Sequence, residues 1–359
     1  MTDPTLFRPF TIGSHKLPNR IVMAPMTRRR AAAGKVPGPV VAQYYAQRAS
    51  AGLIVSESIE VDPWSGLEAP TRPGLFSDAQ QAGWTEVVRA VHAGGGRIFA
   101  QLSHMGRAAL ASQLQPSGRV VGPSPIAAAG TVYTATGPLP YDTPHALSPH
   151  EIAEIVGQYS EAARRARAAG FDGIELQGAN GYLIDQFLRD GSNQRQDAYG
   201  GSAKKRARFL LDVFEAAREH WPSERIGIRI SPNNPFQGMS DSDPKSNFGT
   251  LADILSPLLP AYLHVVEPLA QPAEFPKIAP ILRVRFAGPM ILAGQYDGQS
   301  ARAAIAAGEA DLIAFGEKFI GNPDLPERLR RGAELVRSDK ATHYSGGPDG
   351  YIDYPALAD

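Results

Sequence analysis

The sequence contains no cysteine among its 359 residues. This absence excludes disulfide bonds, thiolate nucleophiles and thiolate metal ligands, so any redox chemistry needs a bound cofactor. An excess of charge of one sign is also missing, because Lys plus Arg and Asp plus Glu number 36 each. A balanced charge creates no field that favours nucleic acid or an anionic membrane surface. The composition therefore predicts small-molecule partners and no nucleic acid.

Long hydrophobic runs are missing as well. No apolar stretch approaches the roughly 18 residues of a membrane span, and the polar, proline-punctuated N-terminus does not resemble a secretory signal. The 8 histidines show no paired metal-ligand spacing, so no metal site is expected. We expect a cytoplasmic protein without a membrane partner. A monomer and a homodimer are both compatible with these features.

What the sequence does contain is a regular alternation of short β-branched apolar runs with longer helical patterns, which favours parallel strands joined by helices. The alternation predicts a (β/α)8 barrel, since eight units without a reversal point favour closure over an open, doubly wound sheet. One domain over residues 1–359 is expected, with a C-terminal tail from about 340 to 359 near the mouth of the barrel. The predicted strands are Ile21 to Ala24, Leu53 to Ser56, Arg97 to Leu102, Gly173 to Leu176, Ile226 to Ile230, Tyr262 to Val266, Met290 to Ala293 and Leu312 to Phe315.

Helices are predicted where Ala, Leu, Glu and Arg recur at helical spacing, namely over Ser148 to Ala169, Lys204 to His220 and Gly298 to Ala307. Two long insertions interrupt the pattern, Gly106 to Leu147 after the third strand and Gly178 to Gly201 after the fourth. Long loops on this face are where barrel enzymes build their sites.

Polar residues and glycines cluster directly after the predicted strands, so a barrel would bring them to one mouth. The turns Gly294-Gln295 and Gly316-Glu317 end the last two strands, where backbone N–H groups often hold a phosphate. The alternative for these glycines is that they only ease tight turns. The other residues of the cluster are Pro25, Thr27, Glu57, Ser58, Gln101, His104, Gln177, Asn180 and Arg229.

Several runs, in order and spread over nearly the whole chain, resemble the old yellow enzyme family. These runs are Asn19 to Arg28, Tyr44-Tyr45, Gln47 to Ile54, Gly181 to Leu183, Asp185 to Leu188, Ser192 to Arg195, Tyr199 to Ser202, Gly227 to Pro232 and Gly350 to Pro355. The resemblance implies a barrel that holds flavin mononucleotide (FMN) at the carboxyl ends of its strands and takes electrons from NAD(P)H.

The resemblance also implies a role for individual residues at the flavin. Thr27, beside Pro25 and Met26, would hydrogen-bond the flavin carbonyl near the reactive nitrogen, and Gln101 would pair with the pyrimidine edge. Arg229 would place a permanent charge near the ring nitrogen that becomes anionic on reduction. Ser58, Gly294, Gln295, Gly316 and Glu317 complete the implied cofactor site.

On the substrate side, the resemblance implies an ene-reductase, which reduces the activated C=C bond of an α,β-unsaturated carbonyl or a similar alkene. Gln177 and Asn180 would hold the carbonyl or nitro oxygen, and Tyr182 would protonate the α-carbon. Ser103 would widen the substrate pocket, and Tyr351 in the C-terminal tail would close over it.

Three residues depart from the family pattern. Gln177 stands where histidine is usual, Ser103 where tryptophan is common, and Glu317 where an arginine clamps the FMN phosphate. A carboxylate near a phosphate is repulsive, so weak FMN binding is expected. An alternative function is a flavin-free or non-redox isomerase or cyclase on the same fold. A catalytically silent binding protein is disfavoured, because Thr27 and Tyr182 are retained along with the other implied polar groups.

Overall fold

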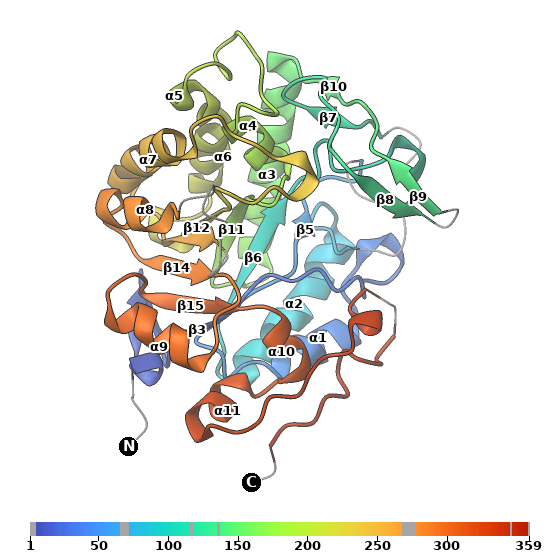
Figure 1. Ribbon diagram of the computed structural model, residues 1–359. Helices are drawn as coiled ribbons and strands as arrows, with labels where there is room; N and C mark the ends of the chain where they lie inside the picture. Colours follow the sequence, from blue (N-terminus) through green and yellow to red (C-terminus); the bar gives the residue numbers. More distant parts are fainter. Residues whose placement is uncertain are drawn as a thin grey trace.

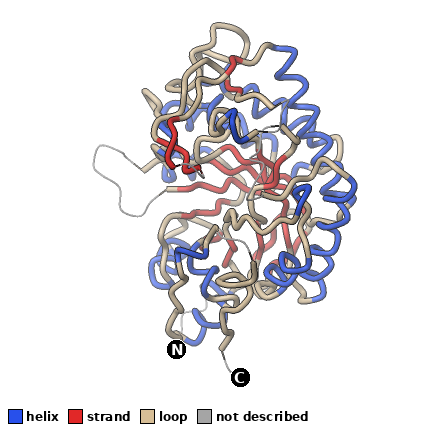
Figure 2. The backbone as a smooth tube through the Cα atoms, turned by 90° about the vertical axis from the view of Figure 1, so that its right-hand side faces the viewer, coloured by secondary structure: helices blue, strands red, loops and turns tan. Residues whose placement is uncertain are grey.

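A computed structural model describes residues 5–64, 72–114, 118–134, 137–267, 277–344 and 347–357. Within this part of the chain, eight parallel strands close into a barrel, because β6 pairs with β4 on one side and with β11 on the other. The strands run through the centre of the molecule and the helices lie outside them (Figures 1 and 2). The barrel strands in closing order are β3 (Ile21–Met23), β4 (Leu53–Val55), β6 (Ile98–Ser103), β11 (Gly173–Gly178), β12 (Ile226–Ile230), β13 (Tyr262–Val266), β14 (Met290–Ala293) and β15 (Leu312–Phe315). All eight predicted strands are therefore confirmed, and so is the barrel.

Helices connect the successive strands. Helix α3 begins as predicted, since Ser148 accepts a hydrogen bond from the Glu151 N–H and proline occupies the first turn. The pattern over Lys204 to His220 forms two consecutive helices that meet at Ala207. The helices are α1 (Pro39–Ala46), α2 (Asp78–Ala93), α3 (Pro149–Ala168), α4 (Leu183–Leu188), α5 (Ala203–Arg206), α6 (Arg208–Arg218), α7 (Pro244–Leu255), α8 (Ala279–Arg285), α9 (Gly298–Ala306), α10 (Glu317–Gly321) and α11 (Leu325–Arg331). None of these helices is long and apolar enough to cross a membrane.

The amino end of the barrel is closed by a hairpin of β1 (Phe10–Ile12) and β2 (His15–Leu17). Ile12 and Leu17 are buried against the inward-facing apolar side chains of the strands, including Phe99 and Tyr262. Apolar packing therefore fills the lower half of the barrel, as expected for a barrel without a pore. Polar side chains enter the interior only nearer the carboxyl ends, where the site lies.

The first insertion forms small strands of its own. The strands β7 (Val121–Gly122) and β10 (His145–Ala146) pair with each other, as do β8 (Thr131–Thr134) and β9 (Gly137–Pro140). They gather beside the barrel at the upper right of Figure 1. A further short strand, β5 (Ile59–Glu60), pairs with the end of β6. Residues 115–117 and 135–136 of the insertion lie outside the described residues.

The C-terminal segment returns to the end of β3, where arginines anchor it. Arg28 is fully buried and donates to the backbone oxygens of His343, at 3.1 Å, and Gly350, at 2.8 Å. Arg30 also donates to the His343 carbonyl oxygen and to three further ones of the same segment, those of Thr342, Gly347 and Asp349. Residues 345–346 and 358–359 of the predicted tail lie outside the described part. The anchoring fixes His343 and Tyr344 beside the barrel mouth.

Tyr351 does not close over the site, which corrects the expectation from the sequence. Its side chain is fully buried and stacks on Tyr44, with ring centroids 4.0 Å apart and an interplanar angle of 8°. The guanidinium of Arg28 lies over both rings. Tyr351 is thus a packing residue that holds the C-terminal segment on α1.

Candidate functional site

A cavity of about 330 Å³ opens at the carboxyl ends of the barrel strands, a volume in the range of small-molecule sites. Its lining includes Ile320, His343 and Tyr344, which the sequence did not single out. The sequence-predicted residues that line it are Pro25, Met26, Thr27, Ser58, Gln101, Gln177, Asn180, Tyr182, Arg229 and Glu317. The barrel therefore brings most of the predicted site together.

Some predicted residues lie elsewhere. Ser103 is fully buried below the cavity, where its hydroxyl lies 2.6 Å from that of Ser58. It reaches the cavity only through Ser58, so the expected direct widening of the substrate pocket is not what its position shows. Gly294, Gln295 and Gly316 end β14 and β15 outside the cavity lining, on turns that the strand register places side by side.

A hydrogen-bonded chain inside the barrel fixes the polarity of Gln177. Glu175 is fully buried and accepts a hydrogen bond from the Gln101 amide at 2.7 Å. The same Gln101 nitrogen lies 3.3 Å from the Gln177 side-chain oxygen. Because a carboxylate only accepts, Gln101 must present its NH2 group on this side, and Gln177 must present its oxygen. The Gln177 NH2 group is therefore left to face the cavity.

Glu175, the first residue of this series of hydrogen bonds, stays ionised. Burial opposes its ionisation, but the facing His264, the charge of Arg229 and the Gln101 hydrogen bond hold the pKa of Glu175 below its ordinary value. His264 contributes a ring nitrogen 2.9 Å from the carboxylate. An ionised Glu175 keeps the orientation of both glutamines unique.

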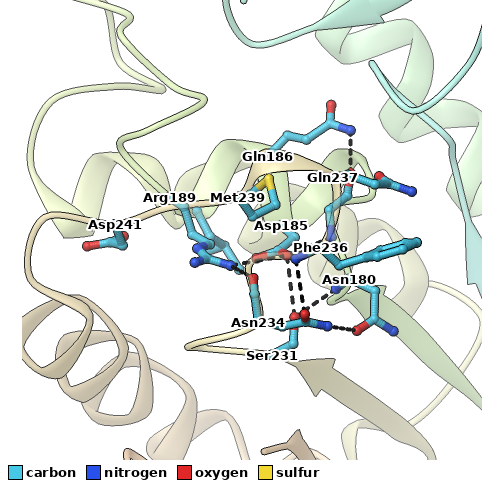
Figure 3. A network of polar contacts seen from close by, with 12 residues as sticks. Asn180, Asp185, Gln186, Arg189, Ser231, Asn234, Phe236, Gln237, Met239 and Asp241 are labelled. Atoms are coloured by element: carbon cyan, nitrogen blue, oxygen red, sulfur yellow. Dashed lines mark hydrogen bonds and ion pairs between the residues drawn. The ribbon is translucent and has the colours of Figure 1, made fainter. Parts of the chain in front are cut away.

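A second pair fixes Asn180 in the same manner. The Asn234 side-chain oxygen accepts from the Phe236 N–H at 3.1 Å, so the Asn234 NH2 group is the one that reaches the Asn180 oxygen, at 2.8 Å. Figure 3 shows the Asn180 nitrogen on the side away from Asn234. Asn180 therefore offers a donor to the cavity, as Gln177 does. Two amide donors can converge there on one oxygen.

The turn that carries these donors has left-handed backbone. Asn180 has φ 58° and Gly181 φ 75°, and a Cβ on Gly181 would lie 2.8 Å from the Gln237 side-chain oxygen. Only glycine fits position 181 without strain. The turn ends at Tyr182, the residue preceding α4, whose phenol oxygen accepts a hydrogen bond from Arg72 at 3.2 Å.

Beneath the turn lies a buried carboxylate, Asp185, which Figure 3 shows beside Ser231 and Arg189. Asp185 accepts from the Gly181 N–H at 2.8 Å, while the Ser231 hydroxyl accepts from the Asn180 N–H at 2.7 Å. Burial raises the pKa of Asp185 to about 6, against the lowering effect of Arg189. The donor turn is thus held from below by side chains of α4 and of the segment after β12.

The residues present fit a flavin. Arg229 is buried in the barrel end, and its Nε finds no hydrogen-bond partner among the described residues. A buried guanidinium needs an acceptor or an anion, which the pyrimidine part of a flavin provides. Gln101 uses its NH2 group inside the protein, so its oxygen remains for a ligand N–H such as that of the same ring. Glu57 accepts from the N–H groups of Arg28 and Arg29 and so holds the segment that presents Thr27.

The part of the cofactor site predicted for the FMN phosphate differs from a typical phosphate site at a helix N-terminus. The N-terminus of α9 is capped by Asp297, which accepts from the Gln299 and Ser300 N–H groups, so these donors are taken. The turns at Gly294-Gln295 and Gly316-Glu317 stay the predicted site of a phosphate. Glu317 is exposed and is one of the residues that line the cavity. Its expected repulsion of a phosphate therefore stands as a prediction.

Sequence reasoning missed five residues of this site, namely Ile320, His343 and Tyr344 in the cavity lining and Arg72 and Asn234 behind it. Tyr344 and Arg72 lie on segments far from the barrel strand ends, and contacts across the fold bring them in, whereas Asn234 lies in the segment that follows β12. Tyr344 stands in the predicted C-terminal tail, but that tail also contains Tyr351 and Tyr354, so an aromatic residue there did not single out this position. Arg72 gave no signal, and the signal for Asn234 was its place shortly after a predicted strand.

Fold and site together define a flavin-dependent oxidoreductase of the old yellow enzyme class. Residues 5–335 match the model of the NADH:flavin oxidoreductase / NADH oxidase family, and the chain belongs to this family. The resemblance found in the sequence is thereby confirmed.

Relatives and solved structures agree with this placement. A probable flavin mononucleotide-dependent alkene reductase of Leishmania infantum is 40% identical over 98% of this chain and 97% of its own. The old yellow enzyme homologue of Zymomonas mobilis superposes with a TM-score of 0.94 at 44% identity, covering 99% of this chain and 100% of that one. Morphinone reductase in complex with tetrahydroNAD gives a TM-score of 0.93 at 44% identity and covers 99% of both chains.

Proposed function

We propose that this protein is an FMN-dependent ene-reductase that reduces the C=C bond of a small α,β-unsaturated carbonyl compound or similar alkene, with NAD(P)H as the electron source. The observation that carries the proposal is the fixed polarity of two amides. Gln177 and Asn180 both turn their NH2 groups to a cavity that Tyr182 also lines. Such a pair suits a substrate oxygen that gains negative charge during the reaction.

The chain's own groups divide the chemistry between them. The amide donors bind the substrate oxygen and stabilise the enolate charge, while the Tyr182 hydroxyl delivers a proton to the α-carbon. Bound FMN supplies hydride chemistry. Arg229 provides a positive charge at the barrel end, and Tyr344 covers the mouth from the C-terminal segment. Glutamine in place of histidine at position 177 keeps the donor but removes a group that could become charged.

The Tyr182 hydroxyl is compatible with both reduction and isomerisation, since each delivers a proton to a carbon. A net reduction consumes one proton at carbon, and Tyr182 presents a hydroxyl for it in the cavity. An isomerase or cyclase needs the enolate-stabilising donors without a net consumption of NAD(P)H. The two functions therefore differ in whether NAD(P)H is consumed.

The proposal is tested by the visible spectrum of the purified protein with added FMN. We expect a flavin band that NADPH or NADH bleaches in the absence of oxygen. Failure to bind FMN even at high concentration would overturn the proposal and favour the isomerase.

A further inference from the structure

Arg72 lies directly behind the proposed proton donor. Its side chain is buried, one terminal nitrogen donates to the Tyr182 hydroxyl oxygen at 3.2 Å, and the other contacts the Met105 sulfur at 2.6 Å. The guanidinium carbon lies 5.4 Å from the centroid of the Tyr182 ring. Arg72 thus holds the tyrosine by its oxygen and by its ring.

The hydrogen bond between Arg72 and Tyr182 can have only one direction. A guanidinium donates hydrogen bonds and never accepts them, so the Tyr182 oxygen must be the acceptor. The phenol hydrogen cannot point at Arg72, and it remains available for a group in the cavity. Without Arg72 the hydroxyl would be free to rotate away from the substrate.

The acidic neighbours of Arg72 also have partners of their own. Glu60 forms a buried ion pair with Lys35, and Glu57 accepts hydrogen bonds from two backbone N–H groups. Burial works against the charge of Arg72, but Tyr182 and Glu60 outweigh it and raise the pKa of Arg72. Its Nε has no hydrogen-bond partner among the described residues. Among the described residues the guanidinium donates to two acceptors, the Tyr182 oxygen and the Met105 sulfur, and a thioether is the weaker acceptor of the two.

We propose, on the basis of the ene-reductase function above, that Arg72 is a positioning residue for proton transfer, which aims the Tyr182 hydroxyl at the substrate and stabilises the phenolate that proton transfer leaves behind. The Tyr182 O–H bond breaks and the proton forms the new C–H bond at the α-carbon. The hydride that originates from NAD(P)H reaches the β-carbon, and a solvent proton restores the phenol. The other charged or titratable groups that act on Tyr182 or Arg72 are Arg29, Arg229, Tyr141, Glu57 and Glu60.

The test is a double-mutant cycle on FMN-loaded protein, in which flavin reduction by NADPH and flavin reoxidation by cyclohexenone are measured separately. Each of the variants Arg72→Leu and Arg72→Lys is made once in the otherwise unmodified protein and once together with Tyr182→Phe. We expect Arg72→Leu to slow reoxidation by about tenfold or more when Tyr182 is present, as for loss of assistance to a general acid. In the Tyr182→Phe protein, Arg72→Leu should not reduce the rate of reoxidation any further. Flavin reduction should be unchanged.

Two controls separate positioning from structure. Arg72→Lys keeps a buried donor and should recover part of the rate. Arg29→Gln removes a neighbouring charge that lies over Tyr344 instead of bonding Tyr182, and it should leave the solvent deuterium isotope effect on reoxidation unchanged. Arg72→Leu should raise that isotope effect, because proton transfer becomes slower.

The outcomes distinguish this inference from the proposed function. If the unmodified protein reduces cyclohexenone but Arg72→Leu slows reoxidation equally with Tyr182 and with Tyr182→Phe, Arg72 acts on something other than the proton donor and the inference is wrong. If Arg72→Leu and Arg72→Lys both lose flavin reduction as well, Arg72 is structural and the inference is also wrong. If the unmodified protein binds FMN but reduces no activated alkene, the proposed function itself has failed.

Discussion

The Asn234 amide donates a hydrogen bond to the side-chain oxygen of Asn180 at 2.8 Å, and this bond decides which end of Asn180 faces the cavity. Its direction is imposed by the Phe236 N–H, which occupies the Asn234 oxygen. Asn234, which is not part of the cavity lining, thus controls the orientation of Asn180, which is.

Replacing Asn234 by Asp should weaken binding of phenols, which mimic the enolate. A carboxylate cannot donate to the Asn180 oxygen, so the Asn180 amide loses its fixed orientation and turns its NH2 group to the new acceptor. We expect a loss of about 1 to 3 kcal/mol in phenol binding, measured by perturbation of the flavin spectrum. Asn180→Ala should cost as much, and Asn234→Asp should add little to it. Additive losses in the double variant would contradict this coupling.

Tyr182→Phe should slow alkene reduction while flavin reduction by NAD(P)H stays nearly intact. Only the reaction with the alkene needs the phenol proton, so the two half-reactions separate. Stopped-flow absorbance of the flavin measures both. An equal loss in both halves would mean that Tyr182 serves the structure of the turn.

Glu317→Arg should tighten FMN binding by about tenfold or more, since it exchanges a repulsive neighbour of the phosphate for a bidentate charged donor. Glu317→Gln is the matched control, because it removes the repulsion without adding a charged donor. Its affinity for FMN should lie between those of the unmodified protein and of Glu317→Arg. Quenching of FMN fluorescence gives the affinities, and the gain should shrink with added salt. Unchanged affinity in both variants would show that the phosphate is held away from α10.

Asp185 predicts a pH-dependent stability. Its pKa in the folded protein is about 6, above the ordinary value of 3.8, so the folded state keeps a proton that the unfolded chain has lost. This carboxyl therefore reduces stability as pH rises from about 4 to about 6, and the loss persists at higher pH. Asp185→Asn retains an acceptor for the Gly181 N–H and should stabilise the protein at pH 7 by up to about 3 kcal/mol, with no gain near pH 4. Thermal unfolding at the two pH values measures the effect.

The control for this prediction is Asp253→Asn, which alters an exposed carboxylate paired with Arg285. It should change stability little at either pH. Equal shifts for Asp185→Asn at pH 4 and pH 7 would rule out titration of Asp185 as the cause.

Tyr351→Leu should destabilise the protein by about 2 to 4 kcal/mol, because it removes a ring stacked between Tyr44 and arginine. Tyr351→Phe keeps the ring and should be close to neutral, since the Tyr351 hydroxyl has no hydrogen-bond partner among the described residues. Tyr344→Leu, at an exposed position on the cavity, should change the KM for bulky alkenes with little effect on stability. Denaturant unfolding and steady-state kinetics separate these outcomes. A large effect of Tyr351 variants on KM alone would restore it to the substrate site.

The sequence predicted the barrel well because strand formation here depends on local pattern. Runs such as Ile226 to Ile230 carry a β-branched residue at every second position and are buried along their whole length, which is typical of a barrel strand. Residues directly after those strands, such as Gln177, were found for the same reason. Arg72 and Tyr344 could not be found, because they reach the site from loops whose path depends on distant contacts. Tyr351 was misplaced because a conspicuous motif indicated importance without indicating whether that importance was packing or binding.

The central claim is that the cavity transfers electrons to an activated alkene. The most direct test is to reduce the FMN-loaded protein with NADPH in the absence of oxygen and then add cyclohexenone. We predict that the bleached flavin band returns at a rate that rises with alkene concentration, and that cyclohexanone forms in an amount equal to the NADPH consumed. A flavin that stays bleached with excess alkenes of this class, or an alkene converted to an isomer without consumption of NADPH, would contradict the claim.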